Sequence, residues 1–178
     1  MRRLGRRSDL DDPKTLRGDL LEQARLARRD PTDVDWDLVD NPGVVWGGPI
    51  REQGGPWEDA LEAAGGLGQR TPDSFKTFDF WDIDTRIATS AKTLDTQALT
   101  YLDRPSRVYG RLKGYIDQID RFDQDLVLNF SINSDLIKAK RLELSVPAGT
   151  TPEQVVQIQR AIEYAESLGI EMKVSLTR

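Results

Sequence analysis

Residues 57–95, the most informative segment of this chain, read WEDALEAAGGLGQRTPDSFKTFDFWDIDTRIATSAKTLD. This segment begins after Pro56, a residue that favours the first turn of a helix, and a pair of glycines ends its first apolar part. Residues 57–64 are therefore predicted to form a short helix, with Glu58 in its opening turn.

Two strands are predicted after this helix. Residues 74–81 alternate in polarity and are rich in β-forming side chains, and residues 85–94 continue in the same way. The aspartates at residues 82–84 are typical of a turn, since aspartate accepts hydrogen bonds from backbone N–H groups just downstream. The two strands are expected to pair with each other directly after the helix.

The rest of the chain adds a second helix and a strand-helix-strand unit. Pro105 precedes a segment whose apolar side chains recur at helical spacing. A strand, a helix and a strand in succession form a β-α-β crossover, which implies parallel pairing. The fold class is predicted to be α/β, an α+β mixed sheet with flanking helices. The further predicted elements are a helix at residues 105–122, strands at 126–132, 140–146 and 170–176, and a helix at 152–168.

The N-terminal part of the chain differs from the rest in composition. Residues 1–41 are rich in charges and poor in large apolar side chains, and we interpret them as a linker segment. Residues 16–29 could form one amphipathic helix, while the following segment is typical of a loop. A turn at residues 41–43 marks the expected boundary, so residues 42–178 are predicted to form the globular domain.

The composition excludes several classes of catalytic site. The chain has no cysteine and no histidine, which removes disulfides, thiolate metal sites, Ser-His-Asp hydrolases and nucleases that use imidazole as a base. Catalysis must then use carboxylates, hydroxyls, lysine, arginine or a metal ion held by oxygen ligands. The net charge of −5 weighs mildly against nucleic acid as a partner, because phosphate binding draws on a basic surface.

No targeting segment is evident in the sequence. No apolar run approaches the roughly 18 residues that span a bilayer, so no stable membrane insertion of this domain is expected. The basic N-terminal residues lack the apolar segment of a signal peptide that should follow them. If the domain is exported, we expect a larger parent protein to carry it.

One carboxylate, that of Asp79, lies within an aromatic run. The sequence around it is Phe78-Asp79-Phe80-Trp81, and a strand of this kind rarely holds a charge unless the charge is paired or bound to a cation. An edge-strand aspartate that faces water is the plain alternative. Lys92 favours the functional interpretation, because its side chain is expected on the strand face that lies beside Asp79.

Four residues of this stretch suit phosphodiester hydrolysis. Oxygen atoms of Glu58, Asp79 and Ser90 could hold a divalent ion, which lowers the pKa of its bound water and polarises the phosphoryl oxygen. Lys92, two residues after Ser90 and on the same strand face, could orient that water and stabilise developing charge. We therefore predict that Glu58, Asp79, Ser90 and Lys92 form the catalytic site, with the first three as metal ligands.

The spacing resembles that of the PD-(D/E)XK nucleases, with one departure. The usual motif has an acid two residues before the lysine, where this chain has Ser90, and Glu58 on the preceding helix could supply the missing carboxylate. Three segments narrow the resemblance: GGPIREQGGPWED (47–59), FKTFDFWD (75–82) and ATSAKTLD (88–95). They are similar to the C-terminal nuclease toxins of contact-dependent growth inhibition (CDI) exoproteins, the CdiA type. In that branch a helix glutamate, a strand aspartate and a Ser-x-Lys pair form the site.

The resemblance implies a function, a cofactor and a partner. It implies a restriction-endonuclease-like core that acts as a metal-dependent endonuclease toxin on DNA, with a tRNA-cleaving toxin of the same fold as the alternative. It implies zinc, whereas hard oxygen ligands would equally accept magnesium or manganese. It also implies a cognate immunity protein, secretion as the C-terminal part of a larger exoprotein, and action in the target-cell cytoplasm. Residues 1–41 would then be a linker or pre-toxin segment. A non-catalytic interaction module with a degenerate nuclease fold is the alternative from another class.

Basic side chains on or near the helix at residues 105–122 are candidates for substrate binding. Arg107 and Arg111 are four residues apart and so share a helix face. Phosphate tracking is the functional interpretation, and a solvated helix face is the plain one. A second basic cluster contains Lys138, Lys140 and Arg141, and its role is open. The predicted substrate-binding residues are Arg104, Arg107, Arg111 and Lys113.

Overall fold

The computed structural model describes residues 34–178, which form one compact unit. The helix predicted at residues 16–29 lies outside the described residues. The unit contains the helices α2 (Ile50–Ala64), α3 (Leu99–Asp103), α4 (Ser106–Asp120) and α5 (Pro152–Ser167), and a short 3₁₀ turn, η2 (Ser134–Leu136). Its strands are β1 (Asp37–Val39), β2 (Gln69–Arg70), β3 (Phe80–Asp82), β4 (Ile87–Thr93), β5 (Gln124–Val127), β6 (Phe130–Asn133), β7 (Ala139–Pro147) and β8 (Ile170–Thr177).

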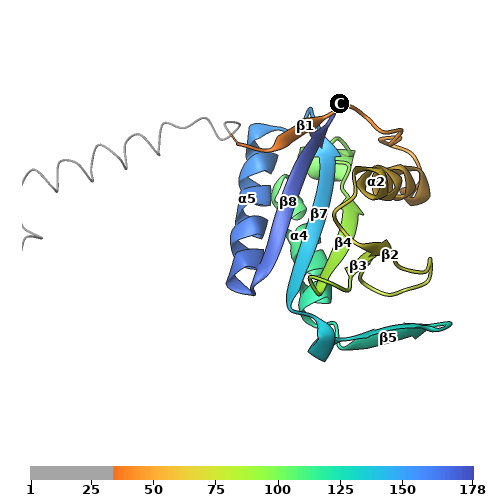
Figure 1. Cartoon of the computed structure of the whole chain (residues 1–178). Helices are drawn as coiled ribbons and strands as arrows, with labels where there is room; N and C mark the ends of the chain where they lie inside the picture. The colour runs from red at the N-terminus through yellow and green to blue at the C-terminus, as the bar shows by residue number, and fades with distance from the viewer. Residues whose placement is uncertain (1–33) are drawn as a thin grey trace, which may run out of the picture. The chain divides into compact units, whose positions relative to one another are not determined.

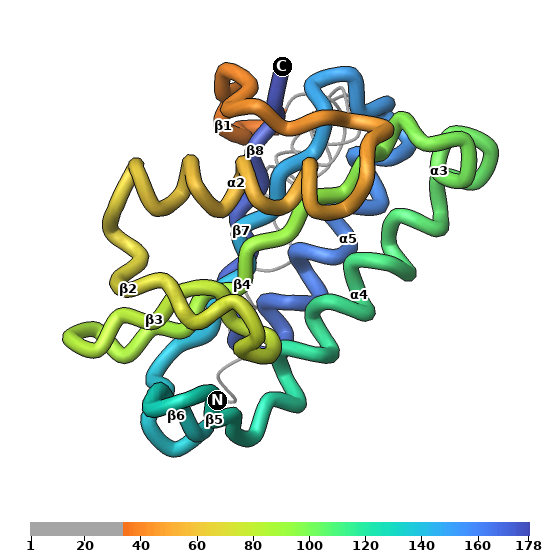
Figure 2. Tube along the Cα trace, turned by 90° about the vertical axis from the view of Figure 1, so that its right-hand side faces the viewer, coloured from red at the N-terminus to blue at the C-terminus, as the bar shows by residue number. Residues whose placement is uncertain are grey.

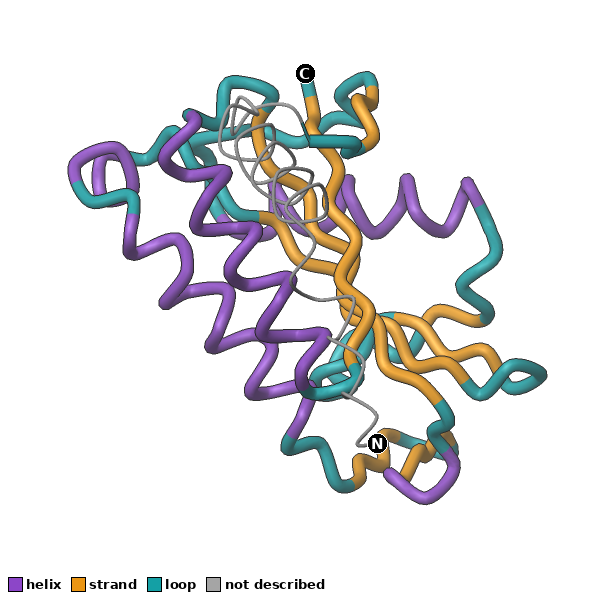
Figure 3. The backbone as a smooth tube through the Cα atoms, turned by 90° about the vertical axis from the view of Figure 1, so that its left-hand side faces the viewer, coloured by secondary structure: helices purple, strands orange, loops and turns teal. Residues whose placement is uncertain are grey.

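Six of the strands form one mixed sheet in the order β1-β8-β7-β4-β3-β2. The pairs from β1 to β4 are parallel, and β4-β3 and β3-β2 are antiparallel. α4 and α5 pack together on one side of the sheet, and α2 lies on the other side (Figures 1, 2 and 3). This arrangement confirms the predicted α/β mixed sheet with flanking helices.

The predicted β-α-β crossover is confirmed as β7-α5-β8. Thr151 caps α5 by accepting a hydrogen bond from the backbone N–H of Gln154, whose side chain in turn accepts from the Thr151 N–H. Gly169 ends the connection with a φ of +72°, a conformation that favours glycine. The parallel strands then place Leu142, Leu144 and other fully buried side chains against α4 and α5.

The helix that carries Glu58 begins earlier than predicted. α2 starts at Ile50, so Pro56 lies inside the helix and not at its first turn. A proline at this position leaves the carbonyl of residue 52 without its helical N–H partner. The Val45 N–H donates to the Glu52 carbonyl at 3.1 Å instead. This tertiary hydrogen bond lets the helix continue through Pro56, and Glu58 lies deep in α2.

Three further boundaries differ from the predictions. Residues 74–79 are irregular, with Thr77 at a φ of +73°, so Asp79 lies just before β3 and not within a strand. The single strand predicted at residues 126–132 is wrong, because Leu128 takes a φ of +55° and turns the chain between β5 and β6. The predicted N-terminal loop contains β1, which pairs with β8, and the compact unit begins at Val34.

In the part of the chain that the structure describes, no helix has the length and apolar character needed to cross a membrane.

Candidate active site

Asp79 lies at the point where β3 separates from β4. Its backbone N–H donates to the Thr89 carbonyl at 2.9 Å, although Thr89 lies opposite Phe80 in the β3-β4 register. Its side chain then takes the place of the next backbone partner, because Asp79 Oδ2 accepts the Ala91 N–H at 2.7 Å. The carboxylate is thus fixed by the edge of β4, with 21% of its side chain exposed.

Lys92 and Ser90 reach the same carboxylate oxygen from β4. Lys92 Nζ lies 3.4 Å from Asp79 Oδ2, and Ser90 Oγ lies 3.5 Å from it. Ser90 is fully buried, whereas 27% of the Lys92 side chain is exposed. The structure therefore brings Asp79, Ser90 and Lys92 together as the sequence predicts, and it leaves the lysine accessible to a ligand.

Glu58 faces the same region from α2. Glu58 Oε2 is 2.8 Å from Arg70 Nη2, and 26% of the Glu58 side chain is exposed. Burial raises the pKa of the Glu58 carboxyl, and the charge of Asp79 raises it further. The hydrogen bond from Arg70 and the charge of Lys92 oppose this rise. The Asp79 charge thus lies close enough to disfavour ionisation of the Glu58 carboxyl.

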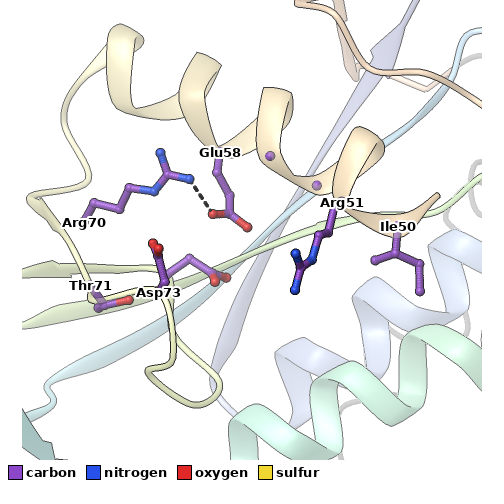
Figure 4. A pocket seen from close by; sticks show the side chains of 9 residues that line it. Ile50, Arg51, Glu58, Arg70, Thr71 and Asp73 are labelled. Atoms are coloured by element: carbon purple, nitrogen blue, oxygen red, sulfur yellow. Dashed lines mark hydrogen bonds and ion pairs between the residues drawn. The ribbon is translucent and has the colours of Figure 1, made fainter. Parts of the chain in front are cut away.

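A polar cavity of about 530 Å³ separates α2 from the segment before β3. Figure 4 shows Glu58 and Arg51 pointing into it from α2, with Asp73 on the opposite side. Asp79 also lines the cavity, whereas Ser90 and Lys92 contact Asp79 and are not among the lining residues. The residues that line the cavity are Ile50, Arg51, Gly54, Gly55, Glu58, Arg70, Thr71, Asp73 and Asp79.

This donor set fits a divalent cation with hard oxygen ligands. Glu58 and Asp79 face one cavity, and a cation between them would relieve the repulsion that raises the Glu58 pKa. Across residues 34–178, no three acidic side chains are grouped closely enough to form a metal cluster by themselves. The carboxylates would therefore need other oxygens, and the place of Ser90 among them stays a prediction.

The predicted substrate-binding residues fall into two groups. Arg107 and Arg111 both lie near Tyr101. Burial raises the pKa of the Tyr101 hydroxyl, and the positive charges of the two arginines partly oppose this rise. Arg111 Nε also donates to Tyr115 Oη at 3.1 Å. Arg104 follows α3 and is exposed. These three residues form an exposed basic surface on α3 and α4.

Lys113 lies elsewhere, in the contact between α4 and α5. Its Nζ is 2.7 Å from Asp117 Oδ2 and lies 4.7 Å from the centre of the Tyr164 ring. Tyr164 Oη also donates to Asp117 Oδ1 at 2.6 Å. The structure thus separates Lys113 from the Arg107–Arg111 surface and gives it partners of its own.

The second basic cluster is largely engaged by neighbours. Arg141 Nε donates to Glu171 Oε2 at 2.7 Å, and Lys140 Nζ donates to the Asp120 carbonyl at 3.0 Å. Lys138 is exposed. Two of the three cations therefore already have acceptors on this domain.

Sequence reasoning missed two arginines of the cavity. Arg70 follows a glycine-rich loop and Arg51 precedes Pro56, so neither lay inside a predicted element. Spacing along the chain could have indicated Arg51. It lies seven residues before Glu58, and residues seven apart share a helix face when both lie on one helix, as they do on α2. Trp57, next to Glu58 on α2, is buried and donates from its indole nitrogen to the Glu143 carbonyl at 3.3 Å.

Comparisons with known proteins identify the family of this chain. A family model described as the CDI toxin restriction endonuclease-like domain matches residues 53–175. The chain belongs to this family. The predicted resemblance to CdiA-type nuclease toxins and the restriction-endonuclease-like fold are thereby confirmed.

Two similar CDI proteins are nucleases by name. The chain is 38% identical over 133 residues, 75% of its length, to "Deoxyribonuclease CdiA" of Yersinia pseudotuberculosis serotype O:3 (strain YPIII). It is equally similar over the same length to "Deoxyribonuclease CdiA-o11" of Escherichia coli O157:H7 (strain EC869). The matched part covers 12% and 35% of these two relatives, so both are much longer than the CDI domain described here.

A solved structure of the same family supports the fold in detail. The "CdiA-CT/CdiI toxin and immunity complex from Yersinia pseudotuberculosis" matches with a TM-score of 0.64 and 37% sequence identity. The match covers 69% of this chain and 99% of that one. Nearly the whole of that toxin chain therefore has a counterpart in this CDI domain.

Proposed function

We propose that this CDI domain is a metal-dependent endonuclease that hydrolyses phosphodiester bonds of DNA. The observation that carries the proposal is the convergence of Lys92 and Ser90 on one oxygen of Asp79, at the edge of a cavity that also receives Glu58. Carboxylates, a lysine and an open cavity supply what phosphodiester hydrolysis requires in a chain without histidine or cysteine.

The side chains divide the work as follows. Glu58 and Asp79 would hold a divalent ion, zinc, magnesium or manganese, which when bound lowers the pKa of a water and polarises the phosphoryl group. Lys92 lies beside Asp79 with part of its side chain exposed, so its ammonium can orient the attacking water and stabilise charge on the phosphate. The Ala91 N–H holds the Asp79 carboxylate in place throughout.

DNA is favoured over transfer RNA as the substrate. Both named relatives are deoxyribonucleases, and the similarity to each includes the segments that contain Glu58, Asp79, Ser90 and Lys92. A degenerate, non-catalytic module is disfavoured as well. Such a module would have no reason to keep two half-buried carboxylates close together beside a lysine, with the charge of one raising the pKa of the other, Glu58.

One reaction series tests the activity, the substrate and the metal. Purified protein is incubated with supercoiled plasmid or total tRNA, each in EDTA, Mg²⁺, Mn²⁺ or Zn²⁺. We expect nicked and linear plasmid with at least one metal, intact tRNA, and no cleavage in EDTA. Lys138→Ala, which removes an exposed lysine on another edge, serves as a matched control for Lys92→Ala. Cleavage that persists in EDTA, or that is confined to tRNA, contradicts the proposal.

We infer that a cognate immunity protein binds the basic surface of α3 and α4 through an acidic contact surface. The similar solved structure is by title a toxin and immunity complex, and a nuclease must be blocked in the cell that makes it. Arg104, Arg107 and Arg111 lie exposed, whereas Arg141 and Lys140 are already engaged within the domain. Covering this surface would obstruct the path of nucleic acid without contact to the metal site.

Charge reversal tests this contact. Arg107→Glu with Arg111→Glu should slow association with the immunity protein by about tenfold or more at low salt, because opposite charges steer the encounter. Arg160→Glu makes a similar change on the α5 surface and should leave the rate within about twofold. Stopped-flow association at several salt concentrations measures both. If the association rate depends neither on salt concentration nor on these charges, the immunity protein binds another surface.

The CDI family also supports a proposal about delivery. The matched relatives are much longer proteins, so we propose that this domain is secreted as the C-terminal part of a larger exoprotein and acts in the target-cell cytoplasm. Expression of the domain alone inside a susceptible bacterium should then degrade the chromosome, and co-expression of the immunity protein should prevent it. Unharmed DNA in cells that contain folded, wild-type domain contradicts the proposal.

A further inference from the structure

Two arginines line the candidate active site, and their surroundings differ. Arg70 is held by three carboxylates: Nη2 by Glu58 at 2.8 Å, and Nη1 by Asp59 at 2.6 Å and by Glu62 at 3.2 Å. Arg51 is exposed, and within residues 34–178 its guanidinium has neither an ion pair nor a hydrogen bond. The charge of Arg70 is therefore neutralised within the domain, whereas the guanidinium of Arg51 is available to bind an anion.

The position of Arg51 directs it to the cavity. Arg51, Gly54, Gly55 and Glu58 lie on one face of α2, since residues three, four and seven apart share a face. Figure 4 shows the Arg51 side chain extending from this face into the cavity that also receives Glu58. The charge of Arg51 is absent from the groups that shift the Glu58 pKa, whereas those of Arg70 and Lys92 are present.

The space beside Gly54 and Gly55, between Arg51 and Glu58, is open. A Cβ added at Gly55 would meet no atom within 4 Å, and one at Gly54 would meet only Glu58 Oε1, at 3.9 Å. A helix rises about 1.5 Å per residue, so seven residues separate Arg51 from Glu58 by about 10 Å along α2. A phosphate held by Arg51 is therefore a different one from the phosphate attacked beside Glu58 and Asp79.

We propose that Arg51 binds a backbone phosphate that flanks the scissile phosphodiester bond of the nucleic acid. The inference rests on the proposed nuclease function and adds a substrate-binding residue to it. Guanidinium suits this contact, because its planar fork binds two phosphate oxygens and its charge persists at every physiological pH. Arg70, in contrast, is a positioning residue that holds the Glu58 carboxylate toward the cavity.

Salt-dependent binding gives the first test. Lys92→Ala protein, which is expected to bind without cutting, is titrated with a fluorescent DNA duplex at several KCl concentrations. Loss of one phosphate contact should reduce the slope of log K against log salt by about 0.7–0.9. Adding Arg51→Gln should produce this reduction, Arg51→Lys should restore most of the slope, and Arg160→Gln on α5 should leave it unchanged. An unchanged slope with Arg51→Gln overturns the proposal.

Steady-state cleavage by otherwise wild-type protein gives the second test. Arg51→Gln should raise KM severalfold and change kcat little, because the contact is the same in the ground state and the transition state. Arg70→Gln should instead lower kcat, because the ion pair between Arg70 Nη2 and Glu58 Oε2 at 2.8 Å holds the Glu58 carboxylate toward the cavity. Wild-type KM for Arg51→Gln, in a protein that cuts DNA, overturns this inference alone. A wild-type protein that neither binds nor cuts DNA overturns the proposed function with it.

Discussion

The two halves of the sheet differ in how regular their backbone and hydrogen bonding are. In the β7-α5-β8 half, strand register is continuous, α5 has a full capping box, and the side chains toward α4 and α5 are buried and apolar. The α2-β3-β4 half contains a proline inside its helix, a non-glycine residue at positive φ, and an aspartate side chain in place of a backbone partner. The irregular half is also the one that gathers the candidate catalytic residues.

This difference indicates which half of the domain is less stable because it holds the candidate catalytic residues. In the regular half, local preference, packing and hydrogen bonding favour the same structure. In the other half, Glu58 and Asp79 are kept close together at the cost of a raised Glu58 pKa. Backbone strain and unfavourable charge of this kind persist only where many surrounding contacts hold the residues in place. Mutations in the two halves should therefore separate activity from stability.

The largest expected effect is on activity, in the irregular half. Lys92→Ala and Asp79→Ala should each lower the cleavage rate by about 10²–10³ or more, because each removes a charge from the site of reaction. Both side chains are partly exposed, so the fold should be retained. Plasmid cleavage and circular dichroism measure the two properties. Near wild-type cleavage by either folded variant would refute the site assignment.

The largest expected effect on stability is in the regular half. Leu144→Ala on β7 removes a fully buried side chain from the core cluster, and such truncations cost about 2–5 kcal/mol of unfolding free energy. Urea denaturation measures this change. Cleavage per folded molecule should stay within a few-fold of wild type at low temperature. A large loss of specific activity would show that the two halves are coupled.

A smaller, pH-dependent effect compares the half-buried Glu58 with the buried Glu143. Burial is the largest of the effects that raise the pKa of Glu58 on α2. It is also the largest of the effects that raise the pKa of Glu143 on β7. A raised pKa disfavours the ionised form in the folded state, so each group costs stability as the pH rises from its ordinary value through its folded value. Glu58→Gln and Glu143→Gln should each stabilise the domain near neutral pH.

Activity then distinguishes these two variants. Glu143 lies on β7 under Trp57 and lines a different cavity, against β1, so Glu143→Gln should keep wild-type cleavage. Glu58→Gln should lose cleavage while it gains stability. Thermal melts from pH 4 to 8 should show each gain disappear toward the acidic end, where both forms of the carboxyl are protonated. A gain that is independent of pH would rule out ionisation as its cause.

The smallest expected effect separates two cations of α4. Lys113 is paired with Asp117 and packed against Tyr164, so Lys113→Ala should change DNA affinity by less than about twofold. Arg107→Ala, on the exposed side, should weaken DNA binding and reduce its salt slope. Fluorescence anisotropy measures both variants. Equal losses for Lys113 and Arg107 would indicate that DNA contacts the α4-α5 side as well.

The sequence alone predicted most of the regular half. Apolar spacing, the Thr151 cap and Gly169 act within a few residues of each other, so the order and type of β7, α5 and β8 follow from local preference. The residue types of the site were also readable, because an aromatic run around Asp79 and a Ser-x-Lys pair are unusual combinations. The absence of histidine and cysteine then restricted the chemistry to oxygen ligands and lysine.

The positions of the site residues, and the contacts that hold them, follow from interactions between separate elements. α2 continues through Pro56 because the Val45 N–H satisfies the carbonyl of Glu52, a contact between residues that no local pattern connects. Arg70 pairs with Glu58 across a loop, and the Asp79 side chain replaces a strand partner of Ala91. Arg51 enters the cavity only because α2 begins at Ile50. These features depend on hydrogen bonds and charges between separate elements, whereas the sequence encodes directly only the preferences of each element by itself.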